Sequence, residues 1–286
     1  MRIGYYPGCS LEKSAKEYDR SARLVARHLG LQLVDLPDWN CCGATAAHST
    51  DPFLAVALPA RNLLLAEEMG LDVTVPCAAC YQRLRTAHEE LMRDEDLARG
   101  VAGALGRAYR GSVRVYSLLE TVAGIGLESL VAQIVNPLRG LRVACYYGCL
   151  LVRPPKVACD DPENPQLMER VIEVTKAETV DWGYKNECCG AALIFGAREV
   201  ALGMILRILR GAVNTGAQAI ACACPLCQSN LDLRQGQVNR LFGTNFALPV
   251  FYFPQLLGLA MGLNPHDLGF ESHFVDPQRA LRALGA

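Results

Sequence analysis

The sequence predicts an α/β protein made of two similar halves, each with a parallel sheet, related by a pseudo-two-fold axis. Short apolar runs of strand length alternate with longer helical runs along the chain. A spacing pattern of five cysteines occurs twice. The 286 residues, of which 51% are hydrophobic and 20% charged, are enough to bury a large core. We expect an N-terminal half over residues 1–135 and a C-terminal half, with a C-terminal extension, over residues 140–286.

The elements of the first half follow from its apolar pattern. Strands are predicted over residues 2–7, 31–37 and 72–77. Between the first two, residues at helical spacing predict a helix that ends at Gly30, with one face formed by Tyr18, Ala22, Val25 and Leu29. Two more helices are expected, over 53–69 (closed by Gly70) and over 78–94.

The second half repeats this alternation. Its predicted strands cover residues 141–147, 178–182, 218–222 and 249–253. Strands that alternate with helices predict parallel pairing through right-handed crossovers. In such sheets ligands bind beyond the carboxyl ends of the strands, and the cysteines follow these strand ends. Each set of five cysteines is therefore expected to converge on one edge.

Composition narrows the class of partner. The net charge is −1, and basic and acidic residues are mixed along the chain, so we expect no binding to nucleic acid or to an anionic membrane. The longest apolar stretch, which begins at residue 118, contains two glutamates, and no membrane span is expected. The opening "MRIGYYPGCS" lacks the apolar core of a signal peptide, so a cytoplasmic location is expected.

The thirteen cysteines point to metal or redox chemistry. Their number is odd and the cytoplasm is reducing, which makes a disulfide framework a poor explanation. Ten of them form two matched sets: Cys9, Cys41, Cys42, Cys77 and Cys80, then Cys149, Cys188, Cys189, Cys224 and Cys227. In both sets an adjacent pair precedes a glycine, and 33 residues separate that glycine from a C-x-x-C pair. This is an internal duplication of roughly 140 residues.

Five thiolates are one more than most metal sites use. Zinc and an ordinary cubane iron–sulfur cluster each take four ligands. The extra thiolate must bridge irons, belong to a cluster that is not a cubane, or be a free reactive thiol. Adjacent cysteines reach one site only through a sharp bend, and Gly43 and Gly190 permit that bend and let backbone amides approach cluster sulfurs.

Other interpretations of the cysteines stay open at this point. A disulfide between adjacent cysteines is strained, and it does not explain the distant C-x-x-C pair. Either C-x-x-C pair alone is compatible with half of a zinc site or with a redox dithiol. Three cysteines have no counterpart in the first set and are expected to be buried structural residues: Cys145, Cys159 and Cys222.

The two motifs, with the segments "YYPGCS", "DWNCCGA", "VPCAAC", "YYGCLLVRPP", "DDPENP" and "CPLCQSNLD", resemble the B subunit of heterodisulfide reductase, within the CCG-domain family. The resemblance covers residues 3 to about 260. It implies two non-cubane [4Fe-4S] clusters, each bound by the five cysteines of one motif, which face each other across the site of disulfide cleavage. It also implies two partners, an iron–sulfur C subunit and a flavin-containing A subunit.

Reduction of a disulfide requires two electrons, and two clusters offer one site to each sulfur. No G-x-G-x-x-G follows a predicted strand, since "GIGLES" at 124 falls in a predicted helical stretch, so no flavin or nicotinamide site is expected on this chain. The substrate is expected to be a small thiol or disulfide, or a protein-bound lipoyl group. His48 is a candidate proton donor, and Arg153, with Lys156, a candidate site for an acidic substrate group.

Two alternative functions are retained. In one, the chain is the CCG subunit of a lactate- or glycolate-type dehydrogenase, whose clusters only transfer electrons. In the other, it is a structural zinc protein, in which one or both motifs bind zinc to stabilise the fold.

Overall fold

The computed structural model describes residues 1–282 and contains two four-stranded parallel sheets. The strand orders, β2-β1-β3-β4 and β6-β5-β7-β8, are the same in the two halves. The first sheet comprises β1 (Arg2–Tyr5), β2 (Gln32–Asp35), β3 (Val73–Val75) and β4 (Val115–Ser117). The second comprises β5 (Arg142–Tyr146), β6 (Glu178–Thr179), β7 (Ala219–Cys222) and β8 (Val250–Tyr252). The predicted α/β fold with two parallel-sheet halves is thus confirmed.

The strand order determines where each sheet can bind a ligand. From β1 the chain runs outward to β2 and then returns to β3 on the other side, so the order reverses between β1 and β3. The same reversal lies between β5 and β7. Such a switch point leaves a crevice at the carboxyl ends of the two central strands. The cysteine motifs begin at these ends.

Helices connect the strands in both halves. The first half contains α1 (Gly8–Glu12), α2 (Lys16–His28), α3 (Ala47–Thr50), α4 (Leu54–Met69), α5 (Ala78–Arg93), α6 (Glu95–Leu105), α7 (Leu118–Ala123) and α8 (Leu127–Val131). The second half contains α9 (Leu167–Glu173), α10 (Arg198–Asn214), α11 (Pro225–Leu233), α12 (Gln235–Phe242), α13 (Phe253–Ala260) and α14 (Gln278–Leu281). It also has the 3-10 turns η1 (Pro155–Val157), η2 (Ala191–Leu193) and η3 (Phe270–Ser272).

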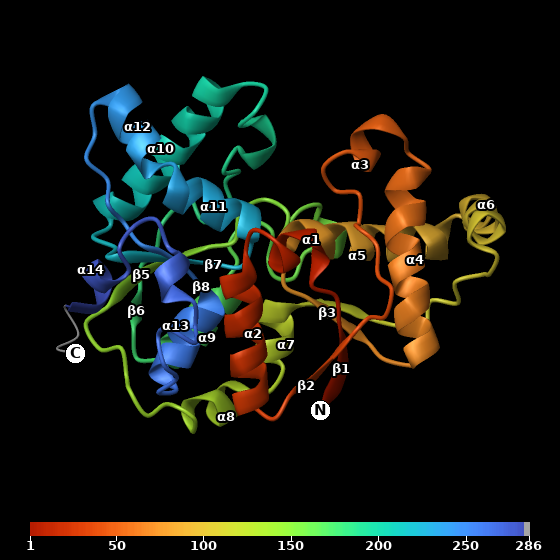
Figure 1. Cartoon of the computed structure of the whole chain (residues 1–286), viewed down its shortest axis with the longest axis horizontal. Helices are drawn as coiled ribbons and strands as arrows, with labels where there is room; N and C mark the ends of the chain where they lie inside the picture. The colour runs from red at the N-terminus through yellow and green to blue at the C-terminus, as the bar shows by residue number, and fades with distance from the viewer. Residues whose placement is uncertain (283–286) are drawn as a thin grey trace.

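Four helices join the two halves. Figure 1 shows α2 and α7 on the side of the first sheet that faces the second half, and α9 and α13 on the corresponding side of the second sheet. Helix α13 packs on α2, and α7 packs on α9, so each half contributes equivalent helices to the junction. The aromatic rings of Tyr18 and Tyr252 stack across it, with centroids 4.0 Å apart. The hydrophobic core is continuous through both halves.

Two parts of the first half differ from expectation. Strand β4, at the edge of the sheet, was not expected, because it runs directly into the apolar stretch that begins at residue 118. The stretch from residue 118 forms two short helices, α7 and α8, and Gly126 between them has a φ of +98°. The segment "GIGLES" therefore contains a helix break, at residues 124–126, and then enters α8. Over residues 1–282, every helix is too short or too polar to traverse a bilayer.

Candidate iron–sulfur site

The cysteines of each motif lie at the carboxyl ends of the two central strands. Cys77 follows β3 and forms the N-cap of α5, and Cys224 follows β7 and forms the N-cap of α11. Because the helix begins at the first cysteine of each C-x-x-C pair, the second lies one turn later on the same side. Both pairs therefore present two sulfurs at the switch point of their sheet.

The second cysteine of each adjacent pair contacts the C-x-x-C pair of the same half. The Sγ atoms of Cys42 and Cys80 are 3.4 Å apart, and those of Cys189 and Cys227 are 3.5 Å apart. These distances are too long for a covalent bond, and all thirteen cysteines are free thiols. The same contact is thus present in both halves.

The two cysteine sets meet at the junction of the halves. The thiols of Cys77 and Cys224 lie close enough for each to shift the pKa of the other, although they belong to different halves. Helices α1 and α11, one from each half, lie side by side at this point (Figure 1). The C-x-x-C pairs therefore form one continuous sulfur-lined region.

The sharp bends at the adjacent cysteines are present. Gly43 and Gly190 have φ values of +75° and +74°, in the left-handed region that favours glycine. Their N–H groups point back at the first cysteine of each pair, with the amide nitrogen 3.5 Å from Cys41 Sγ and 3.4 Å from Cys188 Sγ. Backbone dipoles thus face the sulfurs, which stabilises negative charge on them.

A second pair of glycines, at the ends of the first strands, has an equally specific role. Gly8 and Gly148 have φ values of +69° and +66°. A Cβ atom on Gly8 would lie 2.9 Å from Cys80 Sγ, and one on Gly148 would lie 3.0 Å from Cys227 Sγ. Only glycine leaves room for these sulfurs, which explains why "GC" recurs in both halves.

Hydrogen bonds between thiols favour ionisation at defined positions. Thiol donation from Cys41 and from Cys80 lowers the pKa of Cys42 to about 3. In the second half, donation from Cys149 lowers the pKa of Cys188 to about 6. The pKa of Cys224 is also well below its ordinary value, because Cys227 and Cys77 donate to it. Their partners have raised pKa values instead, because they donate to a neighbouring sulfur: Cys41, Cys77, Cys80, Cys149 and Cys227. The arrangement of thiols therefore favours a thiolate, the form that binds metal, at three of the ten positions.

The donor set fits iron–sulfur binding. Within residues 1–282 no three His, Cys, Asp or Glu side chains are arranged to enclose a single metal ion. A cluster of several irons spreads its ligands over different irons, so its thiolates lie further apart than those around one ion. Ten soft sulfur donors, supported by inward-facing amides, match iron–sulfur clusters in chemical type.

The two predicted polar site residues lie at the edges of this region. His48 is exposed on α3, one turn after Gly43, and its backbone N–H donates to the Gly43 carbonyl at 3.4 Å. Arg153 lies in the loop after Cys149 and pairs with Glu163, Nη1 to Oε1, at 3.4 Å. Neither side chain contacts a cysteine through a hydrogen bond in the described residues. Their predicted roles remain predictions.

The three cysteines without counterparts lie inside the second half or at its border. Cys145 and Cys222 are fully buried in β5 and β7. Cys159 is half-buried in the loop after η1, with its thiol near Ser117 of the first half, and its backbone N–H donates to the Leu151 carbonyl at 3.0 Å. These surroundings are those of ordinary packed cysteines.

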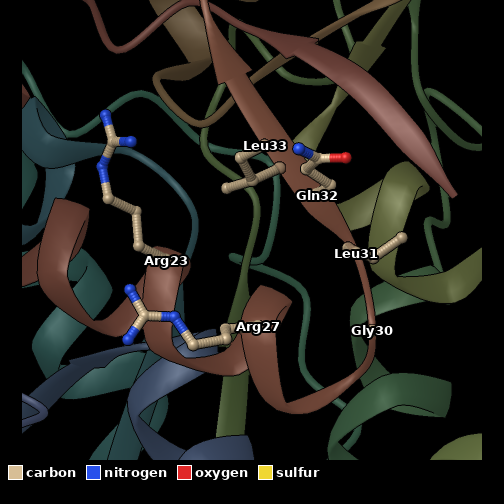
Figure 2. A pocket seen from close by; sticks show the side chains of 6 residues that line it. All are labelled: Arg23, Arg27, Gly30, Leu31, Gln32 and Leu33. Carbon is tan, nitrogen blue, oxygen red and sulfur yellow. The ribbon is translucent and has the colours of Figure 1, made fainter.

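A surface hollow of about 320 Å³ lies away from the cysteines (Figure 2). It is formed by the end of α2 and the start of β2, at the outer edge of the first sheet, and Figure 2 shows the two guanidinium groups beside it. Its lining residues are Arg23, Arg27, Gly30, Leu31, Gln32 and Leu33. None of them is a cysteine, so this hollow is separate from the sulfur-lined region.

Comparisons with known proteins agree with the duplication. The family model described as "CCG: Cysteine-rich domain" matches residues 3–85 and 143–232. The chain is 33% identical over 276 residues to the 8-methylmenaquinol:fumarate reductase membrane anchor subunit of Wolinella succinogenes, covering 96% of this chain and 97% of that protein. It is also 33% identical over 282 residues to the B subunit of the ferredoxin/F(420)H(2)-dependent CoB-CoM heterodisulfide reductase of Methanosarcina acetivorans, covering 96% and 94%.

One solved structure has the same fold. The crystal structure of a hypothetical protein from Helicobacter pylori matches with a TM-score of 0.79 at 16% identity, over 96% of this chain and 52% of that one. This chain therefore spans about half the length of that protein. The two family matches, together with identity to relatives over nearly the full length, show that the chain belongs to the CCG cysteine-rich domain family.

Proposed function

We propose that the chain is the iron–sulfur subunit of a heterodisulfide reductase-like complex, in which a disulfide is reduced to two thiols or two thiols are oxidised. Each set of five cysteines would hold one non-cubane [4Fe-4S] cluster. The observation that carries this proposal is that the two matched sets adjoin through Cys77 and Cys224. A complex of this type would supply a C subunit with ordinary clusters and a flavin-containing A subunit.

The stoichiometry of the reaction suits two adjoining sites. Cleavage of a disulfide consumes two electrons and two protons and yields two thiols. When bound, the clusters would supply electrons one at a time. With one site in each half, each sulfur of the substrate would face its own cysteine set. The inward-facing amides of Gly43 and Gly190 stabilise negative charge at both places.

The two polar residues have separate proposed roles. His48, next to the first CCG turn, would donate a proton to a departing thiolate. Arg153, after Cys149, would bind a carboxylate or phosphate of the substrate once released from Glu163. His48→Gln should reduce turnover and flatten its pH dependence, whereas Arg153→Gln should raise KM for acidic substrates with little change in kcat. Unchanged kinetics in either variant would remove that residue from the mechanism.

A second candidate function rests on the similarity to the fumarate reductase subunit, which equals that to the heterodisulfide reductase subunit in identity. In this function the two clusters transfer electrons within a dehydrogenase or reductase complex, and no disulfide binds. The two functions differ in one measurement. A thiol or disulfide substrate perturbs the cluster spectrum under the first function and leaves it unchanged under the second.

The cofactor content tests the proposal first. Protein purified without oxygen should contain about eight irons and about eight sulfides per chain, four of each for every cluster. Its electron paramagnetic resonance spectrum should change when the substrate thiol is added after oxidation. Iron near four with zinc near one would mean that one motif is structural. Zinc without iron would establish the zinc protein that the sequence left open.

Substitution of single cysteines tests the ligand assignment. Cys42→Ser and Cys189→Ser each remove one of two adjacent ligands, so one cluster should be lost or simplified and disulfide reduction should fall by about two orders of magnitude or more. Cys159→Ser and Cys222→Ser serve as matched controls, because these residues lack duplicates, and should retain both clusters. Normal turnover in the first pair with loss in the second would show that the assignment is wrong.

A further inference from the structure

Both halves contain a buried tyrosine that holds the backbone just before the adjacent cysteines. The hydroxyl of Tyr6 donates to the carbonyl of Asn40 at 2.9 Å, and Asn40 precedes Cys41. The hydroxyl of Tyr146 donates to the carbonyl of Glu187 at 2.7 Å, and Glu187 precedes Cys188. Each tyrosine precedes Gly8 or Gly148 by two residues, at the end of β1 or β5. The contact is therefore part of the duplicated structure.

The surroundings of the two tyrosines also match. Both side chains are fully buried. The ring of Tyr6 lies 5.3 Å from that of Trp39, and the ring of Tyr146 lies 6.2 Å from that of Trp182. The two tryptophans belong to the Asp-Trp pairs that precede each CCG turn. A tryptophan ring therefore packs beside each tyrosine, edge-on in the first half and tilted in the second.

The contact constrains the first cysteine of each pair through the planar peptide bond. A peptide directs its carbonyl oxygen and its N–H to opposite sides. When Tyr6 fixes the Asn40 carbonyl, it also fixes the direction of the Cys41 N–H and the point from which the Cys41 side chain leaves the backbone. The same holds for Tyr146, Glu187 and Cys188.

We propose that Tyr6 and Tyr146 are positioning residues that orient the peptide before each adjacent cysteine pair, so that both cysteines reach one cluster. This inference rests on the proposed binding of a cluster at each motif. Without the hydroxyl, the peptide is free to rotate and the first cysteine of the pair loses its fixed direction. The second cysteine, buried against the C-x-x-C pair, keeps its place.

Loss of the tyrosine hydroxyl should have a larger effect in the second half than in the first. In the first half, the Asn40 carbonyl also accepts a hydrogen bond from the Asn62 side chain at 2.9 Å. In the second half, Tyr146 provides the one hydrogen bond to the Glu187 carbonyl found among residues 1–282. Loss of the Tyr146 hydroxyl therefore leaves a carbonyl without its donor, whereas loss of the Tyr6 hydroxyl does not.

Neighbouring tyrosines supply matched controls. Tyr5, next to Tyr6, donates to Asp19 at 2.8 Å, and Tyr147, next to Tyr146, donates to Glu169 at 2.5 Å. These hydroxyls are buried and hydrogen bonded but make no contact with a CCG turn. Tyr5→Phe thus removes one hydrogen bond, one residue away from the proposed one. Tyr147→Phe removes two, because the Tyr147 hydroxyl also accepts from the Met168 N–H at 2.5 Å, and it is therefore the more severe control.

The test compares four Tyr→Phe variants of the full chain, purified without oxygen, in iron content, paramagnetic resonance spectrum and rate of iron loss to a chelator. We expect Tyr146→Phe to alter one cluster signal and to speed its loss about tenfold, a factor typical of one lost buried hydrogen bond. Tyr6→Phe should act in the same direction on the other cluster, but more weakly. Tyr5→Phe and Tyr147→Phe should lower the unfolding temperature without changing the spectrum.

The outcomes separate this inference from the proposed function. Wild-type protein without iron would overturn the function. Wild-type protein with clusters, combined with Tyr146→Phe that loses iron no faster than Tyr147→Phe, would overturn the positioning role and leave the function intact. An equal spectral change in all four variants would mean that the tyrosines act only through general stability, and would also overturn it.

Discussion

At Gly8 and Gly148 the absence of a side chain leaves space for a buried cysteine sulfur. Each combines a left-handed backbone conformation with a cysteine sulfur at the place that a side chain would take. A methyl group there must displace Cys80 Sγ or Cys227 Sγ, because both sulfurs are buried and their helices are packed. Within residues 1–282, five other glycines share the backbone conformation but face open space: Gly30, Gly70, Gly106, Gly140 and Gly243.

This difference gives a prediction at the residue scale. Gly8→Ala and Gly148→Ala should each lower iron content by about four irons, the content of one cluster. Gly30→Ala and Gly140→Ala, whose φ values are +71° and +85° and whose side-chain positions are empty, should only destabilise the fold by about 1–2 kcal/mol. Iron analysis and thermal unfolding of the four variants provide the measurement. Equal iron in all four would contradict the steric argument.

At the same scale, the sequence predicted the two cysteine sets better than it predicted the residues that position them. The sets could be found because five cysteines recur at fixed spacing, and Gly43 and Gly190 because a sharp bend was needed there. The roles of Tyr6 and Tyr146 were missed, since a buried tyrosine usually fills a core and its hydroxyl partner lies more than thirty residues away. Only their repetition before both "GC" pairs was available as a signal.

At the scale of elements, the predictions succeeded where the apolar pattern was long. Helices α2, α4 and α5 lie at the predicted places, and Gly70 ends α4 in a left-handed conformation. Strand β4 was missed because it runs without a break into α7, and its pairing with β3 depends on the tertiary fold. The break at Gly126 was missed because its apolar neighbours favour a continuous helix.

The attachment of the C-terminal segment depends on one buried carboxylate in α11. Asp232 is 1% exposed and accepts hydrogen bonds from the backbone N–H groups of Phe274 and Val275. Burial raises its pKa to about 6, from an ordinary value of 3.8. The folded state therefore holds a proton on Asp232 more tightly than the unfolded state does.

This raised pKa predicts a defined pH dependence. The stabilising effect of the proton is fully present below about pH 4 and disappears as the pH rises through about 6. The stability of wild type relative to Asp232→Asn should thus fall by about 3 kcal/mol across this range. His273, whose pKa burial lowers to about 4, acts in the opposite direction but is present in both proteins and cancels.

The measurement is urea unfolding of wild type and Asp232→Asn, without oxygen, between about pH 4 and pH 7. The quantity to compare is the difference between the two proteins in free energy of unfolding at each pH. Asp232→Asn also changes the hydrogen bonding at Phe274 and Val275, which should shift the free energy of unfolding by the same amount at every pH. A difference that stays constant with pH would show that Asp232 titrates normally.

At the scale of the whole molecule, the junction between the halves is built from helices that the duplication makes equivalent. The equivalent helices α7 and α13 each pack on the opposite half, α7 on α9 and α13 on α2. Val25 of α2 fits closely against Gly258 of α13, beside the stacked tyrosines. The junction therefore belongs to the hydrophobic core, and it holds the two cysteine sets in contact.

This arrangement predicts that residues 1–135 and 140–286 are structural repeats that unfold together. Separating them exposes the stacked Tyr18 and Tyr252 and the core around them, at a cost that neither half recovers alone. Each half contains one of the two tryptophans, Trp39 or Trp182, which makes the two halves separately visible by fluorescence.

The single-tryptophan variants Trp39→Phe and Trp182→Phe allow the test. In each variant, the urea transition of the remaining tryptophan should coincide with the transition of total helix content measured by circular dichroism, because one cooperative unit gives one midpoint for every probe. Each variant serves as its own control, since any loss of stability from the substitution affects both probes equally. If the fluorescence midpoint in one variant precedes the loss of helix by more than the fitting error, the halves unfold independently. The contact between Cys77 and Cys224 would then join two separable domains, and the proposed disulfide site between them would depend on a junction that can open while each sheet stays folded.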